Sequence, residues 1–151
     1  MLTYFIKTKT PIGEFFIVEQ DGEITEITQE LPIGAENAET PALISAITQI
    51  DEYFEHKRTK FTLPVNPRGT AFQRAAWRET AAIPYGETRS YGEIAALIGK
   101  PKAARAVGTA LKYNPIAIIV PCHRVIAKSG KMAGFAWGLD TKEFLLAHER
   151  Q

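Results

Sequence analysis

Features that would mark a metalloprotein, a disulfide-bonded secreted protein or a membrane protein are scarce in this sequence. The 151 residues include one cysteine and three histidines, and no apolar run approaches the ~20 residues that cross a bilayer. One cysteine excludes an internal disulfide and a multi-cysteine zinc site, and the histidines lack a metal-ligand spacing. No basic segment precedes the apolar start, so we expect no signal peptide and a cytoplasmic location. We predict no metal site and no membrane association.

The two halves of the chain differ in the sign of their charge. Residues 1–69 carry six Lys and Arg against eleven Asp and Glu, a net −5, and residues 70–151 carry twelve against six, a net +6. A basic half is typical of a protein that binds a polyanion, most often nucleic acid, although uneven surface charge alone would give the same numbers. With 45% hydrophobic residues, the composition is that of a globular protein of one domain or two small halves.

The first half predicts a small sheet followed by one helix. Three β-rich runs within residues 2–28 are separated by short turns, which predicts an antiparallel meander. Thr40 and Pro41 then open a helical pattern that continues to His56. The stretch 59–69 contains two prolines and a glycine and should be extended. We place the boundary between two domains there, which gives domains 1–66 and 67–151.

The second half predicts mainly helices. Thr70 should cap the first of them, Ser90 and Glu93 form an S-x-x-E capping pattern, Gly99 is a typical helix stop, and Asp140 should cap the last. The two short helices around Gly99 have helix-turn-helix spacing. The predicted fold class is therefore α+β, with a small N-terminal antiparallel sheet plus helix and a mainly helical C-terminal domain. The helical patterns cover residues 70–83, 90–99, 100–114 and 140–149.

The second helix of the helix-turn-helix has unusually small side chains. Ala103, Ala104, Ala106 and Gly108 surround Arg105. Small side chains let a helix approach another surface closely. Close packing against another helix would need the same residues, and Arg105 would then be an ordinary surface arginine.

The only thiol lies in "IIVPCHRVIA", residues 118–127. A thiol attacks as the thiolate, and with a pKa near ~8.5 it needs a neighbouring base or a positive field. His123 is the nearest base, but adjacent residues on a strand point to opposite faces, so contact with Cys122 needs a turn or a bridging water. Glu143 and Glu149 are both candidates to orient the imidazole. The alternative is that Cys122 is a small buried hydrophobic residue.

Three stretches of the second half carry a specific resemblance: "TAFQRAAW", "IPYGETRSYGEIAALIGKPKAARAVGTAL" and "NPIAIIVPCHRVIAKSGKMAGFAWGLDTKEFLLAHE". In order and spacing they resemble the O6-alkylguanine-DNA alkyltransferases, or methylated-DNA–protein-cysteine methyltransferases. The resemblance implies DNA repair by single, irreversible transfer of an alkyl group from O6 of guanine, or O4 of thymine, to the motif cysteine. It implies double-stranded DNA with alkylated bases as the partner and no cofactor. We expect a monomer.

The resemblance also assigns roles to individual residues. Cys122 is the alkyl acceptor, His123 is the base acting through a bridging water, and Glu149 is the carboxylate that orients it. Asn114 ties the helix-turn-helix to the active-site segment. Tyr91 helps to turn the nucleotide out of the duplex and protonates the leaving base.

The same resemblance implies that the helix-turn-helix binds the minor groove and that Arg105 fills the place of the flipped nucleotide. Small side chains suit a groove about 6 Å wide. The residues expected at DNA are Ser90, Ala103, Ala104, Arg105, Gly108, Thr109, Lys112, Arg124 and Ser129. Those expected around the alkylated base are Tyr91, Val125, Phe135, Ala136 and Trp137.

Two positions depart from the family pattern. Phe135 stands where many relatives have a tyrosine whose hydroxyl contacts guanine O6, so backbone N–H groups or Ser129 would have to serve. Trp137 stands where many relatives have a glycine, and its indole should narrow the pocket against benzyl-sized groups.

Three other functions compete with alkyl transfer. One is a lesion-binding module without catalysis, although relatives of that kind carry a tryptophan in place of the cysteine. Another is a helix-turn-helix transcription regulator, which would need a dimer interface and a sensor domain, and the chain has little room for either. The third is a Cys-His hydrolase, which would turn over many times, whereas alkyl transfer is stoichiometric.

Overall fold

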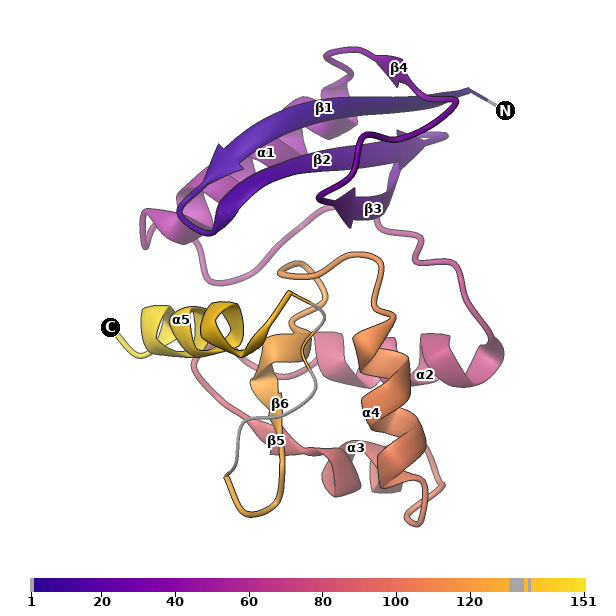
Figure 1. Cartoon of the computed structure of the whole chain (residues 1–151), viewed down its shortest axis with the longest axis vertical. Helices are drawn as coiled ribbons and strands as arrows, with labels where there is room; N and C mark the ends of the chain where they lie inside the picture. Colours follow the sequence, from indigo (N-terminus) through magenta and orange to yellow (C-terminus); the bar gives the residue numbers. More distant parts are fainter. Residues whose placement is uncertain (1, 131–134, 136) are drawn as a thin grey trace. The chain divides into compact units, whose positions relative to one another are not determined.

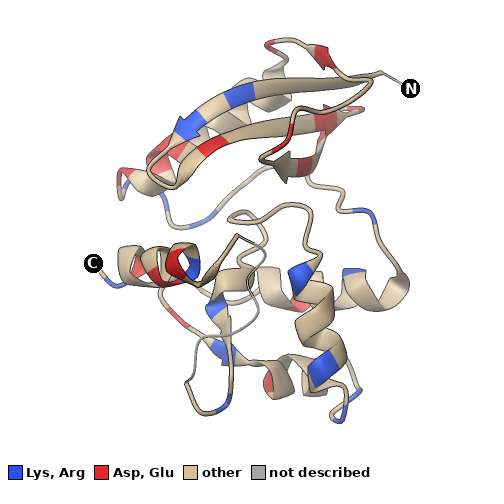
Figure 2. Cartoon of the chain, viewed as in Figure 1, with Lys and Arg blue, Asp and Glu red and all other residues tan. Residues whose placement is uncertain are grey.

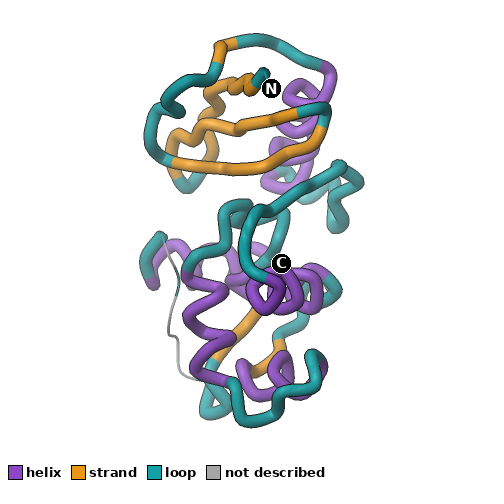
Figure 3. The backbone as a smooth tube through the Cα atoms, turned by 90° about the vertical axis from the view of Figure 1, so that its right-hand side faces the viewer, coloured by secondary structure: helices purple, strands orange, loops and turns teal. Residues whose placement is uncertain are grey.

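A computed structural model describes residues 2–130, 135 and 137–151; Figure 1 and Figure 3 show its backbone. The chain divides into two compact units, Met1–Arg68 and Gly69–Gln151. The division falls inside the stretch 59–69, which lacks regular secondary structure apart from a single bridge at Val65.

Three consecutive antiparallel strands form most of the sheet in the first unit. They are β1 (Thr3–Thr10), β2 (Gly13–Gln20) and β3 (Glu23–Thr28), and they confirm the predicted meander. Asp21 and Gly22 adopt φ values of 53° and 80° between β2 and β3. An Asp-Gly pair at positive φ is typical of a two-residue hairpin turn, so this connection follows directly from the sequence.

A fourth strand makes the sheet mixed rather than purely antiparallel, which corrects the prediction. β4 (Glu36–Asn37) pairs in parallel with β1, and the strand order is β3-β2-β1-β4. Glu and Asn have low strand propensity, so the sequence does not mark this strand. Its pairing arises because the chain returns along the edge of β1, where the Ala38 N–H donates to the Phe5 carbonyl at 3.1 Å.

One helix covers a face of this sheet. α1 (Pro41–Phe54) packs against β1, β2 and β3 (Figure 1). Thr40 caps it as predicted, since its hydroxyl accepts a hydrogen bond from the Leu43 N–H at 3.2 Å. The buried residues on one face of the sheet and along one stripe of the helix are Phe15, Ile17, Ile24, Ile27, Leu43, Ala46, Ile50 and Tyr53.

Helices and a short pair of parallel strands build the second unit. Ser90 and Glu93 form the predicted capping box, and Thr70 forms another with Gln73. The two strands pair directly, so the residues ahead of the helix-turn-helix lie beside those that follow the cysteine motif. The elements are α2 (Ala71–Ala81), β5 (Arg89–Ser90), α3 (Tyr91–Leu97), α4 (Ala104–Lys112), β6 (Val125–Ile126) and α5 (Leu139–Glu149).

α3 and α4 form the predicted helix-turn-helix. Gly99 adopts a φ of 78° after α3, and the Lys100 N–H donates to the Ala95 carbonyl at 2.9 Å, as in a Schellman motif. Trp77 of α2 supports α4 from one side, because its buried indole N–H donates to the Ala110 carbonyl at 2.8 Å. The buried face of α4 is thus held by α2, and the opposite face is available to a partner.

The last helix begins earlier than predicted. Gly138 is the residue before the first turn, with a φ of 95°, and its carbonyl accepts from the Lys142 N–H at 3.2 Å. Asp140 is therefore not the cap but lies in the first turn, where its negative charge suits the helix dipole. The error has a physical origin, since a glycine that starts a helix through its backbone leaves no side-chain signal.

Several basic residues lie on the helix-turn-helix of the second unit. Figure 2 shows acidic residues over the sheet and helix of the first unit, and basic residues on α4 and nearby loops of the second. Lys100, Lys102, Arg105 and Lys112 are all exposed. In the part of the chain that is described, every helix is too short or too polar to span a membrane.

Gly69→Ala should destabilise the second unit. An added Cβ would lie 2.5 Å from Cη2 of Trp77, whose indole cannot move away without losing its bond to Ala110. We expect a loss of about 1–3 kcal/mol in the free energy of unfolding, measured with urea. Gly92→Ala is the matched control, because its Cβ would meet only the Ser90 Oγ at 3.8 Å. Equal stability of the two variants would contradict the packing described.

Candidate active site

The motif around the thiol forms a turn rather than a strand. Cys122–Arg124 is a single 3₁₀ turn, in which the Cys122 N–H donates to the Val120 carbonyl at 2.8 Å and the Arg124 N–H to the Pro121 carbonyl at 2.9 Å. Strand geometry, which would separate the thiol from the imidazole, is not adopted. The chain adopts the turn, one of the two alternatives that the sequence left open, but within the described residues Nδ1 of His123 makes no hydrogen bond to the thiol.

His123 is held by a carboxylate from α5. Its Nε2 lies 2.6 Å from Oε2 of Glu149, and both side chains are buried. Glu143, the other candidate, is exposed. Within the described residues, Nδ1 of His123 is buried and has no hydrogen-bond partner. One ring nitrogen is therefore fixed and the other can accept a proton.

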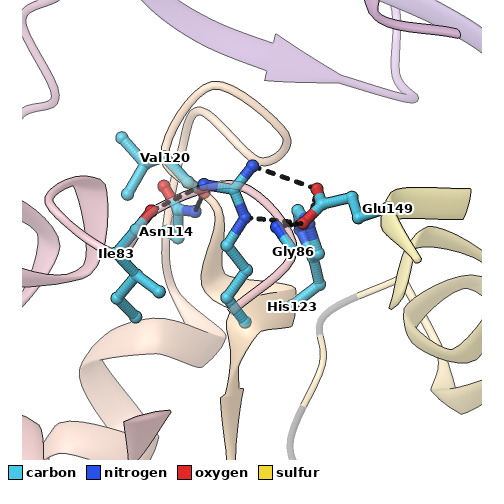
Figure 4. Close-up of polar contacts among 7 residues, drawn as sticks. Ile83, Gly86, Asn114, Val120, His123 and Glu149 are labelled. Atoms are coloured by element: carbon cyan, nitrogen blue, oxygen red, sulfur yellow. Dashed lines mark hydrogen bonds and ion pairs between the residues drawn. The ribbon is translucent and has the colours of Figure 1, made fainter. Parts of the chain in front are cut away.

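Arg124 holds the same carboxylate, and the prediction that it contacts DNA is wrong. Its Nε donates to Oε1 of Glu149 at 2.8 Å, Nη2 to Oε2 at 3.1 Å, and Nη1 to the Ile83 carbonyl at 2.8 Å (Figure 4). The residue is only 6% exposed. All three guanidinium nitrogens have partners inside the protein, so Arg124 recognises a carboxylate rather than a phosphate.

Asn114 closes the loop that precedes the thiol. Its Nδ2 donates to the Val120 carbonyl at 2.8 Å (Figure 4). Its Oδ1 accepts from the Ile116 N–H at 2.9 Å. Inside this loop Ile118 adopts a φ of 75°, which is strained for a β-branched residue. The Asn114 bonds and the burial of the whole apolar run stabilise this conformation, so the thiol is presented from a fixed loop.

Burial keeps the thiol and the imidazole neutral. It raises the pKa of Cys122 to about 11, although a hydrogen bond from Asn114, the charge of Lys142 and nearby backbone N–H groups lower it. Burial also lowers the pKa of His123, against the opposing effect of Glu149. The resting site therefore holds a thiol and a neutral imidazole rather than an ion pair.

Lys142 is a functional residue that the sequence analysis missed. It is fully buried on α5, its Nζ donates to the Val125 carbonyl at 2.6 Å, and the same Nζ lies 3.5 Å from the Tyr91 hydroxyl. Burial lowers its pKa to about 8, and negative charge on Cys122 opposes that shift. The available signal was a lysine seven residues before Glu149, which places both on one helix face.

Both units match one protein family. Residues 3–67 match the ribonuclease-like domain of 6-O-methylguanine DNA methyltransferase, and residues 71–151 match its DNA-binding domain. The chain belongs to the 6-O-methylguanine DNA methyltransferase family. The resemblance inferred from the motifs is confirmed.

Relatives within this family align over almost the full chain. The constitutive methylated-DNA–protein-cysteine methyltransferase of Bacillus subtilis is 43% identical over 99% of this chain and 96% of its own. The methylated-DNA–protein-cysteine methyltransferase of Mycolicibacterium paratuberculosis is 49% identical over 94% and 89%. The crystal structure of Mycobacterium tuberculosis OGT in complex with DNA is 42% identical, with a TM-score of 0.89, and the match covers 97% of this chain and 92% of that one. The α+β fold class is confirmed as well.

Most of the residues expected at DNA line one hollow in this member of the methyltransferase family. Its volume is about 460 Å³, and small α4 side chains keep it open. A Cβ on Gly108 would come within 3.8 Å of the Tyr91 ring. Ala127 also lines the hollow, although sequence reasoning did not name it. The lining residues are Tyr91, Ala104, Arg105, Gly108, Thr109, Lys112 and Ala127.

The remaining residues expected at DNA do not line this hollow. Ala103 is half-buried and precedes the first turn of α4, without a side-chain cap. The Ser90 hydroxyl accepts from the Glu93 N–H at 3.0 Å and is occupied as a helix cap. Ser129 is exposed in the loop after β6.

The residues expected around the alkylated base are partly placed. Val125 is fully buried. Phe135 is buried and packs edge-to-face on Trp137, with ring centroids 6.1 Å apart. Ala136 lies outside the described residues. Tyr91 is half-buried; burial raises the pKa of its phenol, and negative charge on Cys122 raises it further.

Lys142→Met should lower the acidity of the thiol without unfolding the protein. The variant loses a hydrogen bond and also a buried charge, and because these contributions oppose each other we expect a stability change within about 2 kcal/mol. In the wild type, the ammonium is present below its pKa of about 8 and is lost above it. The rate of Cys122 alkylation by iodoacetamide should therefore rise less steeply with pH above about pH 8 than below it.

The same measurement on the variant provides the comparison. Lys142→Met should react more slowly and show no change of slope near that pH, because no cation remains to be lost. Identical pH profiles for the two proteins would show that Lys142 does not act on the thiol.

Proposed function

We propose that this protein repairs DNA by transferring a methyl or other alkyl group from O6 of guanine to Sγ of Cys122. The observation that carries the proposal is the buried Cys122 thiol with a base-carboxylate pair and a buried ammonium around it. The His123–Glu149 pair can accept the thiol proton, and Lys142 can balance the charge of the thiolate. The family supplies the substrate, methylated DNA, by the names of its members.

The first step is proton transfer from the thiol. His123 Nδ1 lacks a partner among the described residues, so it has a lone pair to offer. Since that nitrogen is not bonded to the thiol, we propose that one water relays the proton. The products are a thiolate and an imidazolium paired with the Glu149 carboxylate. The transfer is uphill, because the pKa of the thiol is about 11 and burial lowers the pKa of His123, so it depends on Glu149 stabilising the imidazolium and on Lys142 stabilising the thiolate.

The second step is displacement at the alkyl carbon. The thiolate forms an S–C bond while the bond from that carbon to guanine O6 breaks, and the electron pair leaves with the base. Tyr91 donates its phenolic proton to the departing guanine, and the imidazolium returns a proton to the phenolate through solvent. The net result is that the thiol loses one proton and the restored base gains one, while Tyr91 and His123 return to their starting states. The nearby ammonium of Lys142 stabilises the negative charge on sulfur and then on the phenolate.

The exposed face of α4 is the proposed DNA contact. Arg105, Thr109 and Lys112 lie around the hollow beside Tyr91. We propose that this face enters the minor groove and that Arg105 fills the gap left by a flipped nucleotide. A lesion that pairs badly costs less to flip, which favours damaged bases. Ser90, Ala103 and Ser129 would then contact the flanking backbone.

The proposed reaction happens once per molecule and needs no cofactor. The thioether is stable, and the chain has no second thiol to remove the alkyl group. We propose that the protein acts as a monomer in the cytoplasm. We also propose that a first domain, residues 1–66, is a structural support for the second domain, residues 67–151. O4 of thymine is a second substrate position with the same chemistry.

The main competing function is a lesion-binding module without chemistry. Cys122 argues against it, because a module that only binds has no need of a buried thiol with a base and an ammonium. A Cys-His hydrolase would use the same pair but would turn over repeatedly. A transcription regulator would not need the thiol.

Incubation with a duplex that carries O6-methylguanine should add one methyl group to the protein, measured as intact mass. The wild type should gain the group once and then stop, and Cys122→Ser should gain none while still binding the duplex. Binding without a mass gain in the wild type would favour the lesion-binding module. Repeated turnover of an ester or amide would favour the hydrolase.

Trp137→Gly should extend the reaction to benzyl-sized groups. The indole packs edge-to-face on Phe135, and we propose that it narrows the space for the alkyl group. We expect the wild type to transfer methyl but little benzyl, and the variant to gain benzyl transfer by at least about tenfold, as a pocket change of this size allows. Trp137→Phe is the control that keeps an aromatic ring. Benzyl transfer that stays low in Trp137→Gly would remove this explanation.

A further inference from the structure

Arg124 is bound to Glu149 by two hydrogen bonds and is held from two other sides. The bonds to the carboxylate measure 2.8 and 3.1 Å, and a third bond reaches the Ile83 carbonyl at 2.8 Å. The guanidinium also lies over the Tyr85 ring, 5.6 Å from its centroid. The Gly86 N–H adds a long contact of 3.4 Å to Oε1 of Glu149. The carboxylate is therefore fixed in position and orientation.

The protonation state of that carboxylate decides what His123 can do. A buried carboxyl group tends to become neutral, whereas a bidentate arginine keeps it ionised. An ionised carboxylate can only accept, so the proton in the 2.6 Å contact must lie on Nε2 of His123. Nδ1 then keeps its lone pair. A neutral carboxyl group would instead donate to Nε2 and leave the imidazole proton on Nδ1, where it would block the base.

We propose that Arg124 is a positioning residue that keeps Glu149 ionised, holds the proton of His123 on Nε2, and so leaves Nδ1 free to accept the proton of Cys122. The inference rests on the proposed function only for its kinetic consequence. The tautomer of His123 can be measured without any substrate.

The charges around His123 agree with this role. The charged and titratable groups that face the His123–Glu149 pair in the described residues are Arg124 from the turn, Lys142 from α5, the Cys122 thiol and the Tyr85 phenol. Burial, Arg124 and Lys142 all lower the pKa of His123, and only Glu149 raises it. Because Arg124 already balances the Glu149 charge, the pair does not draw a second proton onto the imidazole.

The test is nitrogen NMR of the histidine ring, combined with single-turnover rates of methyl transfer between about pH 6 and 9. In the wild type we expect His123 to be neutral with its proton on Nε2. Arg124→Met should shift His123 to the Nδ1-protonated or the doubly protonated form. Methyl transfer should then be about tenfold slower at neutral pH, and the acid limb of the profile should move up by about one unit.

Two variants control for charge and for general destabilisation. Arg124→Lys keeps the cation, so it should keep the Nε2 proton and lower the rate equally at every pH. Arg78→Met, on an exposed position of α2, should change neither the tautomer nor the profile.

Each outcome decides the proposal. A wild-type His123 that carries its proton on Nδ1 overturns it, as does an Arg124→Met variant that is uniformly slow with the proton still on Nε2. If Arg124→Met does not fold, the wild-type spectrum and Arg124→Lys decide, because loss of the Nε2 proton in Arg124→Lys also overturns the inference. Failure of the proposed function would look different, since the wild type would then transfer no methyl group while the NMR result could still hold.

Discussion

The buried ion pair between Arg124 and Glu149 connects three segments that are far apart in the sequence. Arg124 belongs to the cysteine motif, Glu149 to the end of α5, and the Ile83 carbonyl and Gly86 N–H to the connection between α2 and β5. A buried pair is favourable only when its geometry is good and its other hydrogen-bonding groups are satisfied. The contacts from all three segments meet that requirement, and through Glu149 they also hold His123.

The Arg124–Glu149 pair also determines which buried charge remains near the thiol. Glu149 balances Arg124, so the buried cation that remains close to the thiol and the phenol is Lys142. A thiol with a pKa of about 11 is almost entirely protonated at neutral pH. Such a thiol reacts poorly with small electrophiles in solution. The proposed chemistry therefore depends on His123 as the base and Lys142 as the cation, which act together while the substrate is bound.

Packing explains why the hollow and the thiol occur in the same unit. The Trp77 indole holds α4 through the Ala110 carbonyl, and Asn114 at the end of α4 closes the loop that carries the thiol. The parallel pairing of β5 with β6 brings the start of α3, with Tyr91, to the segment after the motif. One helix therefore contributes both the exposed face and the support of the reactive loop.

Much of the fold followed from local signals, and most of the errors concern long-range contacts. The meander, the cap at Thr40 and the capping box of Ser90 depend on neighbouring residues, so the sequence was sufficient for them. Asp140 was wrong as a cap because Gly138 begins the helix through its backbone. β4 was missed because its two residues form a strand only beside β1.

The residues of the candidate site also divide into those that the sequence identified and those that depend on long-range contacts. The sequence identified the thiol, its neighbouring base and, through the family motif, Glu149. It assigned Arg124 to DNA because an exposed and a buried arginine look alike in a sequence, and it passed over Lys142 for the same reason. Both assignments depend on which groups face one another after folding, since burial and a charged neighbour determine what an ionisable side chain does. Capping and turn formation act within a few residues, whereas the partners of Arg124 and Lys142 come from distant segments, and only the tertiary structure brings them together.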